Sequence, residues 1–211
     1  MSFSITLLAE TSKKSREEWN QGDLRKINDV LRSNNCPTHF EPLGPTETID
    51  LPCCCGPSSA FSKVLYLPAR FIEDPQFNLD VVAFNRKRRK QRHWYHIPSR
   101  TFNKIQFELK SHLVSNANIH LPIDFDSIFY VESLERGQWI GSSIRLQKEL
   151  RRIAKKLDFK VYKYSPDWEK NHYFKIGEFQ DDPIGDIKSW LLMYHTIASA
   201  SLYYKSAIIR G

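Results

Sequence analysis

A short basic run followed by aromatic residues is the strongest chemical signal in the sequence. Within seven positions it carries six positive side chains and no acidic one. Lysine and arginine bind phosphates, and aromatic rings beside them stack on unpaired bases. Such a run is typical of an exposed, solvated loop, here at 85–97, and the alternative is a binding site for a nucleic acid or another polyanion. The candidate binding residues are Arg86, Lys87, Arg88, Arg89, Lys90, Arg92, Trp94 and Tyr95.

A second candidate anion site is the start of an amphipathic segment, where Gly141 precedes Ser142 and Ser143. The first N–H groups of a helix carry partial positive charge, and serine hydroxyls beside them add donors. Ordinary capping of the helix by a serine is the alternative. The far side of this segment is basic and would extend a polyanion surface; its members are Arg145, Lys148, Arg151, Arg152, Lys155 and Lys156.

Four cysteines and a histidine raise the question of zinc. Cys36 and His39 have the spacing of half a zinc site. The other thiols are adjacent, as Cys53, Cys54 and Cys55, so they point in different directions and leave the second half-site missing. We therefore predict no metal and no cofactor, and interpret the thiols as buried or incidental. The same spacing does not form a disulfide framework, which favours a reducing cytoplasm.

Two further groups have side chains suited to catalysis. Asp124 and Asp126 lie on one side of an extended segment and could hold a divalent cation, or they are two surface acids in a turn. His195 stands among apolar neighbours and is either a general base or a hydrogen-bonded core histidine. Neither a Gly-x-Ser-x-Gly nor a His-Glu-x-x-His motif occurs. We therefore predict no catalytic residue.

The element around which the chain is expected to fold is the last helix, from Ile184 to about Lys205. It is apolar on nearly every side, as a helix surrounded by other elements is. Its unbroken apolar part is shorter than the roughly 20 residues that a membrane span needs, and it contains His195 and Thr196. We predict that this helix is the centre of the core and that it leads into a final strand.

Alternating apolar and polar residues predict a first strand at 2–7, and clusters of β-branched and aromatic residues predict others. Residues 38–57 contain several prolines and are expected to form a loop. The further predicted strands are short pieces within 119–131, then 159–164, 172–176 and 207–209.

Helical spacing of apolar residues predicts four more helices. One starts at Asp23, as the cap, and stops near Asn34. Another follows Ser58 or Ser59 and is expected to kink or end at Pro68. The third follows Pro98, and the fourth runs from about 143 to 157. The residues expected to face inward on the third are Phe102, Ile105, Leu109 and Leu113, and on the fourth they are Leu146, Leu150, Ile153 and Leu157.

The composition is that of a globular protein, with 211 residues of which 41% are hydrophobic and 13% aromatic. Interleaved strands and helices predict a single domain over 1–211, of α/β or α+β class, with a small mixed sheet packed by about five helices. The net charge is +7, but the basic run carries six of these charges, so the rest of the chain is close to neutral. The start of the chain lacks a secretory signal pattern, which again favours the cytoplasm.

Several short motifs together resemble a family of uncharacterised bacterial proteins. They are the segment from Cys36 to Pro42, the helix containing 61–67, Gly141 with the serines that follow, and the apolar helix ending before Ala207 and Ile208. The resemblance implies one domain and adds no activity, cofactor or catalytic residue. The basic run and the triple cysteine depart from the pattern of the family.

These observations favour a cytoplasmic, non-enzymatic binding or interaction protein with an unknown protein partner and no membrane association. The first alternative is a nucleic-acid-associated protein that uses residues 86–92 and the neighbouring aromatics. The second is an enzyme whose site no motif reveals.

Overall fold

A six-stranded mixed sheet organises the computed structural model of the chain. The structure describes residues 2–44, 54–81, 83–84, 97–115, 117–135, 137–162, 164–165, 179 and 182–210, and their side chains except for 2–4 and 54–64. The strand order is β2-β1-β6-β3-β5-β4; only β3 and β5 are parallel. The strands are β1 (Ser2–Leu7), β2 (Cys54–Pro57), β3 (Ala117–Leu121), β4 (Phe129–Val131), β5 (Gln138–Ser142) and β6 (Ile208–Arg210).

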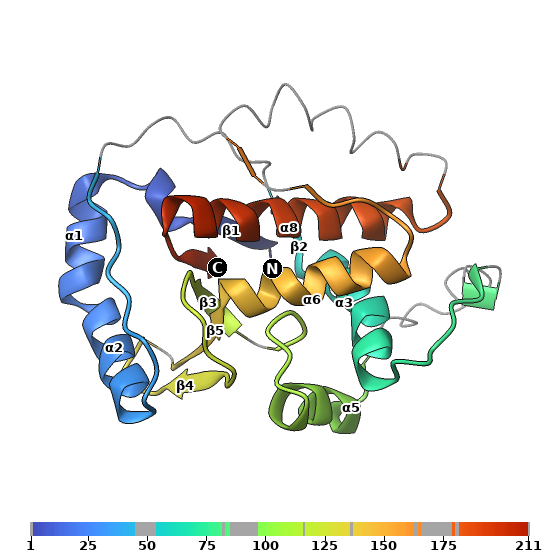
Figure 1. Ribbon diagram of the computed structural model, residues 1–211, viewed down its shortest axis with the longest axis horizontal. Helices are drawn as coiled ribbons and strands as arrows, with labels where there is room; N and C mark the ends of the chain where they lie inside the picture. The colour runs from blue at the N-terminus through green and yellow to red at the C-terminus, as the bar shows by residue number, and fades with distance from the viewer. Residues whose placement is uncertain are drawn as a thin grey trace.

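Helices cover both faces of this sheet. Alternate residues of β3 point in opposite directions: Ile119 and Leu121 join a hydrophobic cluster with α2, whereas the ring of His120 faces Tyr194 of α8 at 6.3 Å. In Figure 1, α6 and α8 run across the middle of the molecule, and α1 and α2 stand at one end. The α-helices are α1 (Lys13–Gln21), α2 (Asp23–Ser33), α3 (Ser58–Glu73), α5 (Ser99–Asn103), α6 (Ser143–Lys156) and α8 (Gly185–Tyr204).

The prediction of a central last helix is confirmed by α8. Leu191 and Ile197 are each only 1% exposed, and they belong to the larger hydrophobic cluster together with residues of α3 and α6. The chain then turns at Lys205, whose backbone is left-handed (φ 52°), and enters β6 between β1 and β3. The helix therefore delivers a strand to the centre of the sheet, and the predicted mixed α/β fold is confirmed.

Several predicted boundaries were wrong. Pro68 lies inside α3, which continues to Glu73 because Leu67, Ala69 and Phe71 are buried in the core and this packing outweighs the lost hydrogen bond. Gly22, and not Asp23, is the N-cap of α2. The predicted loop at 38–57 contains β2 at its end, where Pro57 is tolerated because β2 is an edge strand.

Other elements were missed or misplaced. Residue patterning alone does not predict α1 or β5, and the described part of the predicted strand at 159–164 has no strand structure. The predicted strand at 172–176 lies outside the described residues. The helix after Pro98 is short, and a π-helical segment, η2 (Lys104–Glu108), takes over from α5.

Candidate interaction surface

Three aromatic rings and a leucine form an exposed apolar surface at the β4 edge of the sheet. The ring of Trp139 on β5 lies 5.6 Å from that of Phe107 and 5.1 Å from that of Tyr130, measured between centroids. Phe107 is 57% exposed, Tyr130 48% and Leu109 42%. Rings at these distances support one another and form one surface, which we call the aromatic surface: Phe107, Leu109, Tyr130 and Trp139.

The π-helical segment explains why part of this surface faces solvent. The N–H of Leu109 donates to the carbonyl of Lys104, five residues back, at 3.0 Å. A π turn holds more residues than an α turn, so the side chains after it do not keep α-helical positions. Ile105 is buried as predicted, but the prediction that Leu109 faces inward is wrong. Lys110 then takes a left-handed backbone (φ 50°), which is strained for a residue other than glycine.

The turn between β4 and β5 fixes the position of Tyr130. Gly137 has a φ of 59°, and a Cβ atom there would lie 1.9 Å from the Tyr130 hydroxyl oxygen. Only glycine meets both conditions without strain. Tyr130 and Trp139 are also register partners across the antiparallel pair, so the turn and the ladder hold the same two rings together.

Exposed carboxylates adjoin the aromatic surface along the chain. Glu108 stands between Phe107 and Leu109, and Glu132 and Glu135 lie in the segment that joins β4 to β5. Within the described part of the chain, none of these three acids forms an ion pair with a lysine, arginine or histidine. The aromatic surface is therefore accompanied by negative charge that stays accessible to a partner.

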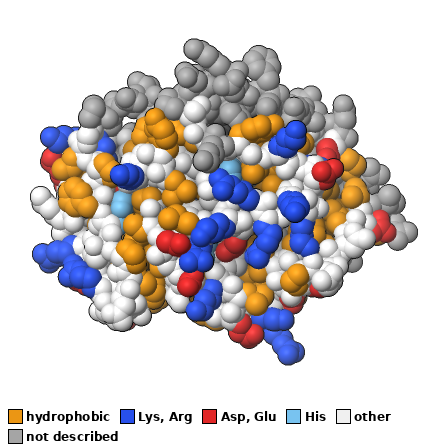
Figure 2. All heavy atoms as spheres, viewed as in Figure 1, with side chains coloured by type: hydrophobic (Ala, Val, Ile, Leu, Met, Phe, Trp, Pro, Cys, Tyr) orange, Lys and Arg blue, Asp and Glu red, His pale blue; other side chains and the backbone are white. Residues whose placement is uncertain are grey.

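The basic helix face predicted for 143–157 is confirmed as the solvent side of α6. Lys148, Arg151, Arg152 and Lys155 are exposed, while Leu146, Leu150 and Ile153 are buried. Lys and Arg side chains gather over α6 across the middle of the face in Figure 2. The face is not purely basic.

Arg145 joins this helix to the acids predicted as a cation site. Its guanidinium contacts Asp124 at 2.5 Å and Asp126 at 2.6 Å, and Lys148 lies 3.6 Å from Asp124. Both carboxylates are thus matched by cationic side chains, which supports the interpretation as surface acids. Within the described part of the chain, no group of three or more His, Cys, Asp or Glu residues is placed to hold a metal ion.

A buried polar cluster lies beneath the start of α6. Glu149 accepts hydrogen bonds from the hydroxyl of Ser111 (2.7 Å) and from the N–H groups of His112 (2.9 Å) and Leu113 (3.2 Å). Burial raises the pKa of Glu149, against the lowering effect of these donors. The carboxylate therefore fixes the segment that leads from the aromatic surface to β3.

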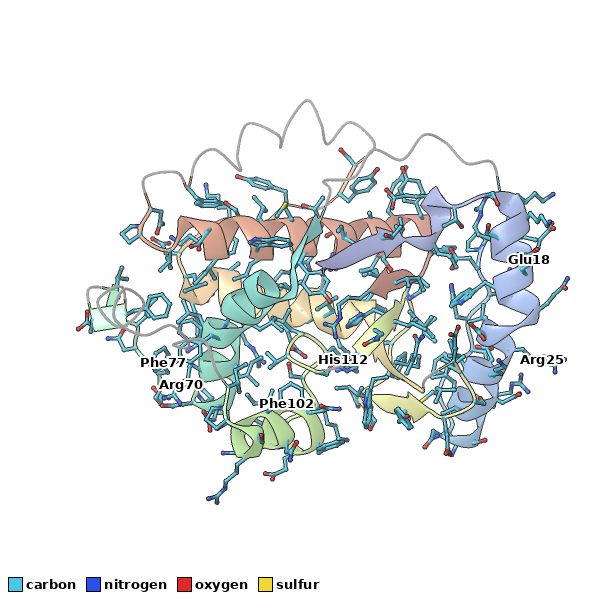
Figure 3. The ribbon with its side chains drawn as sticks, turned by 180° about the vertical axis from the view of Figure 1, so that it is seen from behind. Glu18, Arg25, Arg70, Phe77, Phe102 and His112 are labelled. Carbon is cyan, nitrogen blue, oxygen red and sulfur yellow. The ribbon has the colours of Figure 1, made fainter. Side chains whose placement is uncertain are left out.

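His112 is held in one orientation by two bonds. Its Nδ1 accepts the N–H of Ser142 at 2.9 Å, so Nε2 carries the proton and donates to the carbonyl of Asp126 at 3.3 Å. Burial lowers the pKa of His112 to about 4, which leaves the ring neutral at pH 7. Figure 3 shows His112 near the middle of the molecule, and Glu18 and Arg25 on the α1–α2 side.

Both serines of the predicted anion site are buried and bonded within the protein. Ser142 caps α6 by accepting the N–H of Arg145, and its hydroxyl donates to the carbonyl of Ile123 at 2.6 Å. The hydroxyl of Ser143 lies 2.8 Å from that of Ser201. These contacts correspond to the capping alternative. The candidate binding residues 86–90, 92, 94 and 95 lie outside the described residues, as do all but the last residue of the predicted loop at 85–97.

The remaining predicted groups are core or loop residues. His195 is fully buried; its Nδ1 lies 3.4 Å from the Ser199 hydroxyl, and burial lowers its pKa to about 4. Cys36 is a free thiol, and His39 pairs with Glu41 at 3.1 Å. Cys53 and the side chains of Cys54 and Cys55 lie outside the described parts of the structure.

Sequence reasoning missed the aromatic surface because its members are far apart along the chain. The local sequence around Trp139 carries no pattern that predicts an exposed aromatic cluster. An exposed aromatic cluster beside accessible charges is typical of proteins that bind other proteins. The fold and this surface thus define an α/β protein with an exposed aromatic patch of the kind found at protein–protein interfaces.

The chain belongs to a family described as "Putative DNA-mimic protein", which matches residues 1–210. The expectation of an uncharacterised family that spans the chain is confirmed. Comparison with curated proteins and with solved structures finds no match. Among the helices that the structure describes, none combines the length and apolar character needed to cross a membrane.

Proposed function

We propose that this chain is a non-enzymatic interaction protein whose partner is a DNA-binding protein. The observation that carries the proposal is membership, over residues 1–210, in a family described as DNA mimics. A DNA mimic occupies the DNA-binding face of its partner, so its target is a protein. The nucleic-acid alternative receives no support from this family.

The charge of the chain limits how such mimicry works. DNA is uniformly negative, whereas this chain has a net charge of +7. Overall negative charge therefore does not provide the recognition, and a local surface must do so. The aromatic surface with its accompanying acids, Glu108, Glu132 and Glu135, has the required features. Its rings act as anchors, and its carboxylates complement the lysines and arginines of a DNA-binding face.

The proposal is tested by capture followed by competition with DNA. The whole chain is used as bait in a native lysate, and each captured protein is purified and titrated with labelled duplex DNA by fluorescence anisotropy. We expect the captured protein to bind DNA and the added chain to displace that DNA. Captured proteins without affinity for DNA would overturn the assignment of the partner.

Paired variants locate the surface. In Phe107→Ala/Tyr130→Ala, two exposed rings are removed, and we expect the competing affinity to fall about tenfold or more. Tyr203→Ala removes another exposed ring, on α8, and should stay within about twofold of wild type. Equal competition by all three proteins would show that the aromatic surface is not the binding site.

A further inference from the structure

A cavity of about 500 Å³ lies between α6 and the segment that follows the aromatic surface. Its volume falls within the range of small-molecule sites, about 300–1,000 Å³. Four cationic side chains line it, namely Lys110, Arg145, Lys148 and Arg152, together with Asp126 and Glu149. Whether it favours an anion depends on which of these charges are already matched.

The two carboxylates in the cavity are matched by the protein. The oxygens of Glu149 accept three hydrogen bonds from 111–113, and Arg145 holds Asp126 at 2.6 Å. Asp126 and Arg145 are thus paired with each other, and Glu149 is bonded to the Ser111 hydroxyl and to two backbone N–H groups. These contacts also hold the wall of the cavity in place without any ligand, since Glu149 fixes the segment that carries Lys110.

Three cations remain for a ligand. Lys110 makes no ion pair with any described residue, and its strained left-handed backbone places it at the cavity. Arg152 is exposed, and its positive charge favours the ionised form of Glu149 by lowering the pKa of that carboxyl. Lys148 lies 3.6 Å from Asp124, longer than a charge-assisted hydrogen bond, and Arg145 already contacts that carboxylate at 2.5 Å, so Lys148 is only partly engaged.

We propose that this cavity binds a small phosphate monoester. A phosphate dianion has enough charge and enough acceptor oxygens to engage two lysines and the planar fork of an arginine at once. The cavity is larger than a bare phosphate needs, and Leu109 offers an apolar contact for the organic group of the ester. The site goes beyond the proposed function, and no protein partner is needed to test it.

Calorimetric titration of the whole chain with adenosine 5′-monophosphate, glucose 6-phosphate, inorganic phosphate and citrate tests the class of ligand. We expect at least one monoester to bind more tightly than phosphate or citrate. Tighter binding of citrate would overturn the assignment to phosphate. No heat with any of the four probes up to about 5 mM would remove the site altogether.

A matched pair of double variants tests the location. Lys110→Ala/Arg152→Ala removes two cavity cations, and we expect the affinity for the monoester to fall about tenfold or more. Arg151→Ala/Lys155→Ala removes the same two residue types from the exposed face of α6 outside the cavity, and the affinity should change by about twofold at most. An equal loss in both would mean that general charge, and not the cavity, attracts the anion.

Two further measurements keep the result unambiguous. Lys148→Ala alone should also weaken monoester binding. This single variant tests the cavity even if the double variant does not fold. A single-stranded oligonucleotide is titrated in parallel. If it binds more tightly than adenosine 5′-monophosphate and loses affinity in the same cavity variants, the ligand is a polyanion and the small-molecule assignment is wrong.

Discussion

The carboxylate of Glu41 lies 3.1 Å from Nε2 of His39, and their side chains are only 0% and 5% exposed. Glu41 also accepts the Ser206 hydroxyl and, at 3.0 Å, the N–H of Ala207. The side-chain amide of Asn28 donates to the backbone carbonyl of His39 and accepts from the backbone N–H of His39. One buried acid thus connects the loop after α2 to the point where α8 passes into β6.

Removal of this acid should destabilise the fold. Glu41→Ala leaves the Ser206 hydroxyl, the Ala207 N–H and His39 without their buried acceptor, and each such group costs about 1–3 kcal/mol. We expect the free energy of unfolding in urea to fall by about 3–5 kcal/mol. Glu18→Ala removes an exposed acid from α1 and should change it by about 0.5 kcal/mol at most. Similar values for the two variants would contradict this account.

Leucine truncations compare the core with the aromatic surface. Leu191→Ala opens a cavity beside a helix that is packed on every side, so we expect a loss of about 2–5 kcal/mol in the free energy of unfolding. Leu109→Ala makes the same chemical change at a position that is 42% exposed and should cost about 1 kcal/mol or less. Near-wild-type denaturant midpoints for Leu191→Ala would show that α8 is not the centre of the core.

The free energy of unfolding should decrease as the pH is lowered, because His195 is buried in its neutral form. Its folded pKa of about 4 is below the usual value near 6.5, so the unfolded chain binds the proton more readily. The contribution is fully present above about pH 6.5 and is lost as the pH falls towards 4, at a cost of about 2–4 kcal/mol.

A variant separates this histidine from the others. Burial also lowers the pKa of His112 and of His120, to about 4 and about 3, so the wild-type slope contains all three. Glu149, with its raised pKa, acts in the opposite direction. Urea unfolding of wild type and His195→Gln at about pH 7 and about pH 4.5 should show a smaller loss in the variant. An equal loss would assign the pH dependence to other groups.

Replacement of Gly137 tests the link between the β4–β5 turn and the aromatic surface. Gly137→Ala adds a Cβ in a left-handed backbone and against the Tyr130 hydroxyl, so we expect a loss of about 1–3 kcal/mol and a displaced Tyr130 ring. Chemical shifts of Tyr130 and Trp139 should move together. Gly44→Ala is the control, because nothing lies within 4 Å of its added Cβ. Unchanged Tyr130 shifts in Gly137→Ala would refute the link.

The sequence by itself determined the elements whose residues carry their own pattern. The spacing of buried leucines and isoleucines identified α2 and α6, alternation identified β1, and continuous apolar character identified α8 as central. Burial of apolar area drives each of these elements, and residue spacing along one chain segment records it. Capping of α6 by a serine is equally local and was predicted for Ser142 or Ser143, of which the structure selects Ser142.

The tertiary structure alone decided the rest, because long-range contacts outweighed local preference. Core packing carried α3 past Pro68, and strand neighbours on both sides made β5 from a segment containing Gly141 and Trp139. A π turn brought Phe107 to the ring of Trp139 on β5, and the fold of 109–113 onto Glu149 formed the cavity. Residue spacing does not encode such meetings, since each joins segments that are apart in the chain and depends on how the whole sheet is assembled.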